Sequence, residues 1–142
     1  MNNPKSDIVD LPKIEDPRGN LSFIEHGPRG LCPFEIERVY WVYDVPAGKE
    51  RHGRALRRTS EMIVAMSGSF DVVLDDGCGG ERTISLSRSN SGVAVKPMTW
   101  RSLKNFSTNA VAMVLASAPY DADEYIEDYQ QFIAEVDGRT KH

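Results

Sequence analysis

The sequence is short of cysteine and histidine, and both shortages limit the chemistry that its side chains can perform. Its two cysteines, Cys32 and Cys78, lie in turn-like segments rich in glycine or proline and lack the spacing of a metal site. A disulfide would need both, but two cysteines in 142 residues without a signal sequence favour reduced thiols and a cytoplasmic protein. Of the three histidines, His26 and His142 receive no role, and a metal site of histidine and glutamate ligands is not expected.

Long apolar runs and a strong charge of one sign are also lacking. No window approaches the length of a membrane span, and the first residues, MNNPKSDIVDLP, contain no apolar core of signal-peptide length. A net charge of −4 gives no general electrostatic support for binding nucleic acid. Acidic residues gather towards the C-terminus, whereas the middle is basic, which favours a small anionic ligand held centrally. The central basic residues are Lys49, Arg51, Arg54, Arg57 and Arg58.

Short segments rich in β-branched and aromatic residues, separated by turns, make up most of the chain. Residues 36–45 (IERVYWVYDV) predict one strand, and Asp75-Asp76-Gly77 predicts a hairpin turn before another. Only residues 123–133 show the apolar spacing of a helix. We therefore predict one all-β domain at 8–136, an antiparallel sandwich or barrel with a short C-terminal helix, between a disordered tail at 1–7 and a tail at 137–142. The other expected strands cover residues 21–25, 61–66, 70–74, 82–86, 93–95, 100–106 and 111–116.

Two glycine-containing stretches carry the most specific signal. In the first, GKERHGRALRRTSEMIVAMSG, Gly48, Glu61 and Gly68 stand at the spacing of the first conserved motif of the cupin superfamily. Two positions of that motif hold metal-binding histidines in cupins, and here they hold Arg54 and Leu56. Leu56 can transfer no proton, so we expect it to serve packing.

The second stretch, SGVAVKPMTWRSLKNF, resembles the second cupin motif. Gly92, Pro97 and Asn105 stand at its conserved positions, and its histidine position holds Arg101. The two motifs together imply the cupin double-stranded β-helix, or jelly roll. Ordinary strand–turn–strand glycines are the alternative interpretation.

Longer segments resemble one family within that superfamily. DPRGNLSFIE, PFEIERVYWVYDVPAGKER, SGSFDVVLDDG and the block from VKPMTW to YQQF are similar to the WxcM-like sugar 3,4-ketoisomerases, over about residues 8–133. The resemblance implies a small jelly-roll cupin that forms an intertwined homodimer and works without a metal or other cofactor. It further implies a nucleotide-sugar ligand, dTDP-4-keto-6-deoxyglucose, whose keto group moves from C4 to C3 during deoxysugar biosynthesis.

The chain departs from this family at its histidines. The family's Arg-Gly-x-His-Ala-His is here RHGRAL at residues 51–56, and its Trp-His is Trp100-Arg101. Ketoisomerisation needs a base and an acid, for which histidine is usual, whereas arginine stays protonated. Arg54 is therefore an electrostatic stabiliser, an anion anchor or a solvated charge at the barrel rim. His52 lies two residues earlier, where it shares the face of Arg54 at a different depth.

Other candidate residues lie in segments that match the family. Glu61 keeps the acidic motif position and is expected to pair with Arg54 or Arg101. Tyr40 and Trp41 alternate on a strand, so one faces the interior, and Tyr40 is a proton donor, a sugar contact or a core aromatic. The remaining substrate-binding candidates, for which surface or structural roles are the alternative, are Arg18, Arg51, Trp100 and Asn105. Residues expected to hold the helix are Tyr120, Asp121 and Tyr125.

Two hypotheses follow. In the first, the protein is a sugar-nucleotide 3,4-ketoisomerase in which Tyr40, His52 or Glu61 transfers the proton while arginines stabilise charge. In the second, it is a non-catalytic cupin that binds a nucleotide sugar or another anion, because the motif histidines are lost. A metal-dependent dioxygenase or lyase is the weakest alternative.

Overall fold

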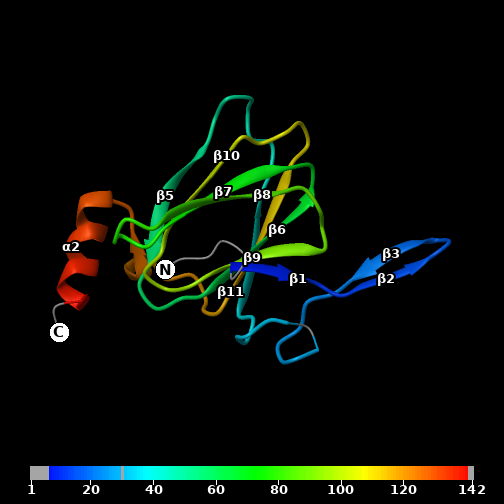
Figure 1. Cartoon of the computed structure of the whole chain (residues 1–142), viewed down its shortest axis with the longest axis horizontal. Helices are drawn as coiled ribbons and strands as arrows, with labels where there is room; N and C mark the ends of the chain where they lie inside the picture. The colour runs from blue at the N-terminus through cyan, green and yellow to red at the C-terminus, as the bar shows by residue number, and fades with distance from the viewer. Residues whose placement is uncertain (1–6, 30, 141–142) are drawn as a thin grey trace.

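Within the computed structural model, which describes residues 7–29 and 31–140, two five-stranded antiparallel sheets face each other (Figure 1). The first sheet has the order β1-β9-β6-β11-β4 and comprises Ile8–Asp10, Ser91–Val95, Glu61–Ser67, Val111–Ala116 and Arg38–Val42. The second has the order β12-β5-β10-β7-β8 and comprises Tyr125–Ile126, Arg51–Leu56, Trp100–Lys104, Phe70–Asp75 and Glu81–Leu86. The prediction of an all-β jelly roll with a short C-terminal helix is confirmed.

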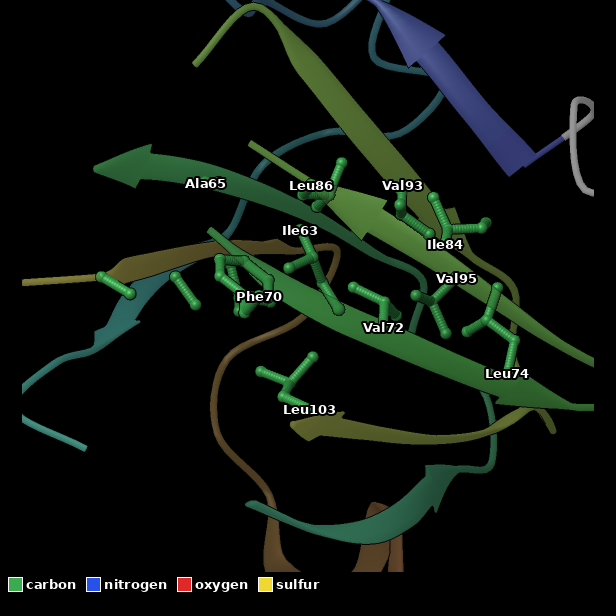
Figure 2. Packing of buried hydrophobic residues seen from close by; sticks show 13 residues of the cluster. Ile63, Ala65, Phe70, Val72, Leu74, Ile84, Leu86, Val93, Val95 and Leu103 are labelled. Carbon is green, nitrogen blue, oxygen red and sulfur yellow. The ribbon is translucent and has the colours of Figure 1, made fainter. Parts of the chain in front are cut away.

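The core lies between the two sheets and follows the period of two that strands impose. Ile63 and Val93 point inwards from the first sheet, and Val72, Leu74 and Leu103 meet them from the second (Figure 2). Each is at most 1% exposed, and burying one such side chain contributes roughly 1.5–3 kcal/mol to folding. Two close-packed layers of this kind hold the strands, and the polar side chains between them, in fixed positions.

The N-terminal part joins the body through a buried ion pair and then leaves it as a hairpin. Of the tail predicted at 1–7, residues 1–6 lie outside the described part, whereas Asp7 is buried and paired with Arg82. Strands β2 (Lys13–Asp16) and β3 (Gly19–Ser22) form a separate two-stranded hairpin. Figure 1 shows this hairpin extending away from the sheets, at the end opposite helix α2.

The C-terminal helix begins later than the sequence pattern predicted. A 3-10 turn, η1 (Ala122–Glu124), is followed by β12, where Tyr125 and Ile126 pair with Leu56 and Ala55 of β5. Their burial comes from this pairing and not from a helical face. Helix α2 (Tyr129–Thr140) starts after Asp128, whose carboxylate accepts from the backbone N–H groups of residues 130 and 131, and it extends past residue 136.

Neither cysteine is linked in a disulfide. Cys32 is buried and donates its S–H to the Phe34 carbonyl at 3.2 Å, and Cys78 is exposed. Both thiols are free, as expected. No helix in the described ranges is both long enough and apolar enough to span a membrane.

Strand β5 contains a bulge that the sequence did not predict. Against β10, Arg54 pairs with Arg101 and Arg51 pairs with Leu103, so β5 carries one residue more than its partner between these pairs. Gly53 lies in this bulge beneath the indole of Trp100, which packs between β5 and the rings of Tyr129 and Phe132 from α2. The helix therefore holds Trp100 against the strand that carries the first motif.

We expect Gly53→Ala to destabilise the protein by ~1–3 kcal/mol, the usual range for overpacking. An added Cβ would overlap Nε1 of Trp100, and the rings of α2 prevent Trp100 from moving away. Urea unfolding monitored by tryptophan fluorescence measures the loss, and Gly53→Ala with Trp100→Phe should recover part of it. Gly138→Ala on α2 is the control, because nothing lies within 4 Å of its added methyl. Equal stabilities of the two alanine variants would contradict this account.

Candidate active site

Four polar side chains from four strands meet in the interior between the sheets. Tyr40 comes from β4 and Glu61 from β6 of the first sheet, and Arg54 from β5 and Arg101 from β10 of the second. Glu61 is 1% exposed and Arg101 3% exposed, so both charges are removed from water. Charged groups are buried to this extent only when they are paired and hydrogen-bonded.

Glu61 pairs with Arg101, which decides between the two partners that the sequence left open. Nη2 and Nε of Arg101 donate to the same carboxylate oxygen, Oε1, at 2.6 and 3.0 Å. Burial alone would lower the pKa of Arg101, but the Glu61 carboxylate and the Tyr40 hydroxyl outweigh burial and raise that pKa above its ordinary value. Arg101 is thus a fixed positive charge at any pH at which the protein is folded.

The Tyr40 hydroxyl lies at the centre of the group. It donates to Oε2 of Glu61 at 2.6 Å and accepts from Nη2 of Arg54 at 2.8 Å and from Nη2 of Arg101 at 2.7 Å. A phenolic oxygen has one proton and two lone pairs, so its hydrogen-bonding capacity is filled. Burial raises the pKa of Tyr40, so the resting phenol is neutral. Trp41, the neighbour on the strand, faces outwards and is 59% exposed.

A cavity of about 200 Å³ opens beside this group. It brings together four of the predicted catalytic residues, since Tyr40, Arg54 and Arg101 line it while His52 lies at its exposed rim. Arg51, predicted to bind substrate, lies at the same rim because the bulge in β5 interrupts the strict alternation of side chains. The other lining residues are Val42, Glu50, Leu103 and Val114.

Three predicted substrate-binding residues lie elsewhere in this chain. Arg18 is at the tip of the β2–β3 hairpin, where its guanidinium binds Asp16. Trp100 packs beneath α2, and Asn105 donates to Asp71 at 2.7 Å from an exposed turn. Leu56, in the second histidine position, is buried and serves packing as expected.

Two residues that contact the site were not predicted to belong to it. Arg38 lies two residues before Tyr40 on β4, on the same face, with its guanidinium 5.1 Å from the centre of the Tyr40 ring. It donates from Nη2 to the hydroxyl of Tyr125 at 2.9 Å, and the Tyr125 ring lies 4.8 Å from the guanidinium of Arg54. Strand alternation could have indicated Arg38, whereas Tyr125 had been assigned to holding the helix.

The donors present suit an anion or a polar neutral molecule better than a metal ion. The cavity is lined by guanidinium groups, which carry only N–H donors and have no lone pair for a cation. In the described part of the chain, no three histidine, cysteine, aspartate or glutamate side chains are grouped to hold a metal ion. The site can hold a sugar-sized ligand beside a phenol, a carboxylate and two fixed positive charges.

We expect Glu61→Gln to lower the free energy of unfolding by about 3–5 kcal/mol, since it leaves the Arg101 charge buried without its counter-ion. The control is Asp16→Asn, which breaks the exposed pair with Arg18 and should cost less than ~1 kcal/mol. Replacing both partners, Glu61→Leu with Arg101→Met, should recover most of the loss. Chemical denaturation of the three variants measures these differences, and a Glu61→Gln loss as small as that of the control would contradict the pairing.

Proteins of similar sequence and structure include sugar 3,4-ketoisomerases. The chain matches the family described as WxcM-like, C-terminal (FdtA) over residues 4–137. It is 36% identical over 125 residues to a TDP-4-oxo-6-deoxy-alpha-D-glucose-3,4-oxoisomerase of Aneurinibacillus thermoaerophilus, covering 88% of each chain.

Solved structures give the same result. The TDP-quinovose 3,4-ketoisomerase WlaRB of Campylobacter jejuni is 38% identical with a TM-score of 0.83, covering 89% of this chain and 95% of that one. A mutant of the 3,4-ketoisomerase QdtA of Thermoanaerobacterium thermosaccharolyticum, crystallised with TDP-4-keto-6-deoxyglucose, is 29% identical with a TM-score of 0.87, covering 93% and 94%. The chain therefore belongs to the WxcM-like family that the sequence resemblance indicated.

Proposed function

We propose that this protein is a 3,4-ketoisomerase that acts on TDP-4-keto-6-deoxyglucose or on another nucleotide-linked 4-keto-6-deoxy sugar. The observation that carries the proposal is Tyr40, which lines a cavity of about 200 Å³ and whose hydroxyl is bonded to Glu61 and to two arginines. This arrangement supplies a proton path in a site that lacks the family's histidines. The names of the relatives support the substrate class.

The reaction moves one proton from C3 to C4 of the sugar and another from the C3 hydroxyl to the C4 oxygen. As Tyr40 passes its proton to Oε2 of Glu61, the phenol oxygen can take the proton from C3, and the electron pair of that C–H bond forms the enediolate. Reversal of these steps returns a proton from Tyr40 to C4. Arg54 and Arg101 stabilise the negative charge that develops. His52 at the rim is the candidate for moving the proton between the two sugar oxygens.

The cavity is large enough for the sugar of the proposed substrate but not for the whole nucleotide sugar. A space of about 200 Å³ holds a sugar ring, and sites for a whole drug-sized ligand are larger. The nucleotide and its diphosphate therefore lie outside, beyond the rim. Arg51 is at that rim, and its planar fork of donors suits a diphosphate.

The saturated bonding of Tyr40 favours a second candidate, a non-catalytic cupin that binds a nucleotide sugar. A substrate can reach the phenol oxygen only if one arginine gives up its hydrogen bond there. If neither arginine yields, the pocket binds a sugar but transfers no proton.

We expect the protein to incorporate deuterium at C3 of dTDP-4-keto-6-deoxyglucose in deuterated water, with appearance of the 3-keto isomer. Proton NMR follows both, and calorimetric titration of dTDP measures binding separately. Tyr40→Phe should lower kcat by about 100-fold or more, the usual contribution of an acid–base group, with little change in dTDP affinity. His52→Asn should lower kcat less. Tyr43→Phe, at an exposed tyrosine three residues along, is the matched control.

Each other outcome selects a different explanation. Tight dTDP binding without exchange would support the non-catalytic cupin. Deuterium exchange that persists in Tyr40→Phe but is lost in His52→Asn would identify His52 at the rim as the base instead of Tyr40. The absence of both binding and exchange would overturn the proposed substrate.

We also propose that the protein works as a homodimer whose hairpins are exchanged. A groove of about 860 Å³ lies between the β2–β3 hairpin and the outer face of β6 and β11, and Leu21, Val64 and Leu115 are among its lining. Ile14 and Leu21 of the hairpin are more than half exposed in one chain. The hairpin of a second copy would cover these apolar surfaces. It would also carry Arg18 to a neighbouring chain, since its own hairpin extends away from β5 and β10 (Figure 1).

We expect Ile14→Asp with Leu21→Asp to convert the dimer to monomers. Both side chains are exposed in a single chain, so the change should weaken association more than folding. Size-exclusion chromatography with light scattering should give twice the chain mass of 15.9 kDa for the unmodified protein and one chain mass for the variant. A single-chain mass for the unmodified protein would overturn the dimer. A cytoplasmic location stays a prediction, supported by the two free cysteines.

A further inference from the structure

Arg54 is held in place by few hydrogen bonds. Its Nη2 donates to Tyr40, whereas its Nε is buried and has no hydrogen-bond partner. An arginine side chain has many rotamers, so a single hydrogen bond does not by itself fix the plane of its guanidinium. Another contact must hold Arg54 if it is to stabilise charge at a defined point.

That contact is the ring of Tyr125. The Arg54 guanidinium lies 4.8 Å from the centre of this ring, closer than the 5.8 Å that separates it from the ring of Tyr40. Tyr125 follows η1 and is aligned with β5 by its pairing with Leu56. A cation over an aromatic face is attracted by the ring's negative face, and more strongly where water is excluded.

Tyr125 is in turn held by Arg38. The Arg38 guanidinium donates to the Tyr125 hydroxyl at 2.9 Å and lies 5.1 Å from the Tyr40 ring and 5.6 Å from the Tyr120 ring. Arg38 belongs to β4 and Tyr125 to β12, which are edge strands of different sheets. The side chains of Arg38 and Tyr40 from β4 therefore meet those of Arg54 and Tyr125 from β5 and β12, and together they join the edges of the two sheets.

We propose that Tyr125 is a positioning residue that holds the Arg54 guanidinium against the Tyr40 hydroxyl, and that Arg38 holds Tyr125. The segment after β11 is then part of the catalytic apparatus as well as the connection to helix α2. The kinetic consequence rests on the proposed function, whereas the positioning itself does not.

A first experiment detects the positioning without turnover. In ¹⁵N-labelled protein, the Nε–H of Arg54 should exchange slowly, since it is buried, and its proton should be shifted upfield by the Tyr125 ring. Arg54→Lys assigns the signal by removing it. Tyr125→Leu should abolish the shift and speed exchange, whereas Tyr125→Phe, which keeps the ring, should retain most of the shift. Tyr120→Leu is the control, because Tyr120 packs against Tyr125 and Arg38 but not against Arg54.

A second experiment measures the effect on the reaction. Tyr125→Leu should lower kcat about tenfold with a small change in KM, and Tyr125→Phe should lower it only a few-fold. Added to Arg54→Lys, Tyr125→Leu should cause no further loss, because it acts through Arg54. Tyr120→Leu should leave kcat within about twofold of the unmodified protein.

The outcomes separate this inference from the proposed function. Equal effects of Tyr125→Leu and Tyr125→Phe on the Arg54 signal, or additive losses with Arg54→Lys, would overturn the positioning role. If the unmodified protein shows no turnover, the proposed function fails while the NMR result still decides the positioning. If Tyr125→Leu does not fold, Arg38→Met replaces it and should reduce the shift of the Arg54 signal. An unchanged Arg54 signal in Arg38→Met would overturn the role of Arg38.

Discussion

The ion pair between Glu61 and Arg101 is the interaction on which the rest of the structure depends. It links a strand of each sheet across the core, where both charges have lost their water. Removing two such charges from water costs several kcal/mol per ion, and their attraction offsets the cost only when the remaining hydrogen-bonding positions are also filled. The Tyr40 hydroxyl supplies a further hydrogen-bond partner to both Glu61 and Arg101. Arg54 then donates to the remaining lone pair of Tyr40. The position of each group thus constrains the next.

Arginine at positions 54 and 101 limits which group can move a proton. Arg54 and Arg101 stay protonated, so they can stabilise an enediolate but cannot accept the proton that forms it. The phenol of Tyr40, neutral at rest and bonded to a carboxylate, combines a proton with a path for its removal. Arg54 and Arg101 oppose the effect of burial on the pKa of Tyr40, since their positive charges favour the phenolate that forms when the proton leaves.

Local patterns in the sequence predicted most of the fold and the centre of the site. The alternation of Tyr40 and Trp41 and the motif positions of Glu61 and Arg101 depend on strand geometry and short spacings, and the structure brings these residues together as expected. Strand β5 was missed because its residues are polar and include Gly53, whose place is set by Trp100 and α2. The helix start was wrong because Tyr125 and Ile126 pair with a strand nearly seventy residues earlier. A strand of two residues is too short to show the alternation of apolar and polar side chains, so no local pattern predicts that pairing.

The site lies where the edge of one sheet faces the edge of the other without backbone pairing. Strands β4 and β12–β5 end their sheets, and backbone pairing between them would have closed the interior. Side chains from Arg38, Arg54 and Tyr125 bridge these edges instead. The cavity beside Tyr40 is lined by residues of β4 and β5. Charged side chains at a sheet edge also disfavour pairing with a further strand. Arg38 and Arg54 bridge the two sheet edges, and Arg54 also lines the cavity beside them. The side chains that connect the edges therefore contribute to the chemistry of the cavity.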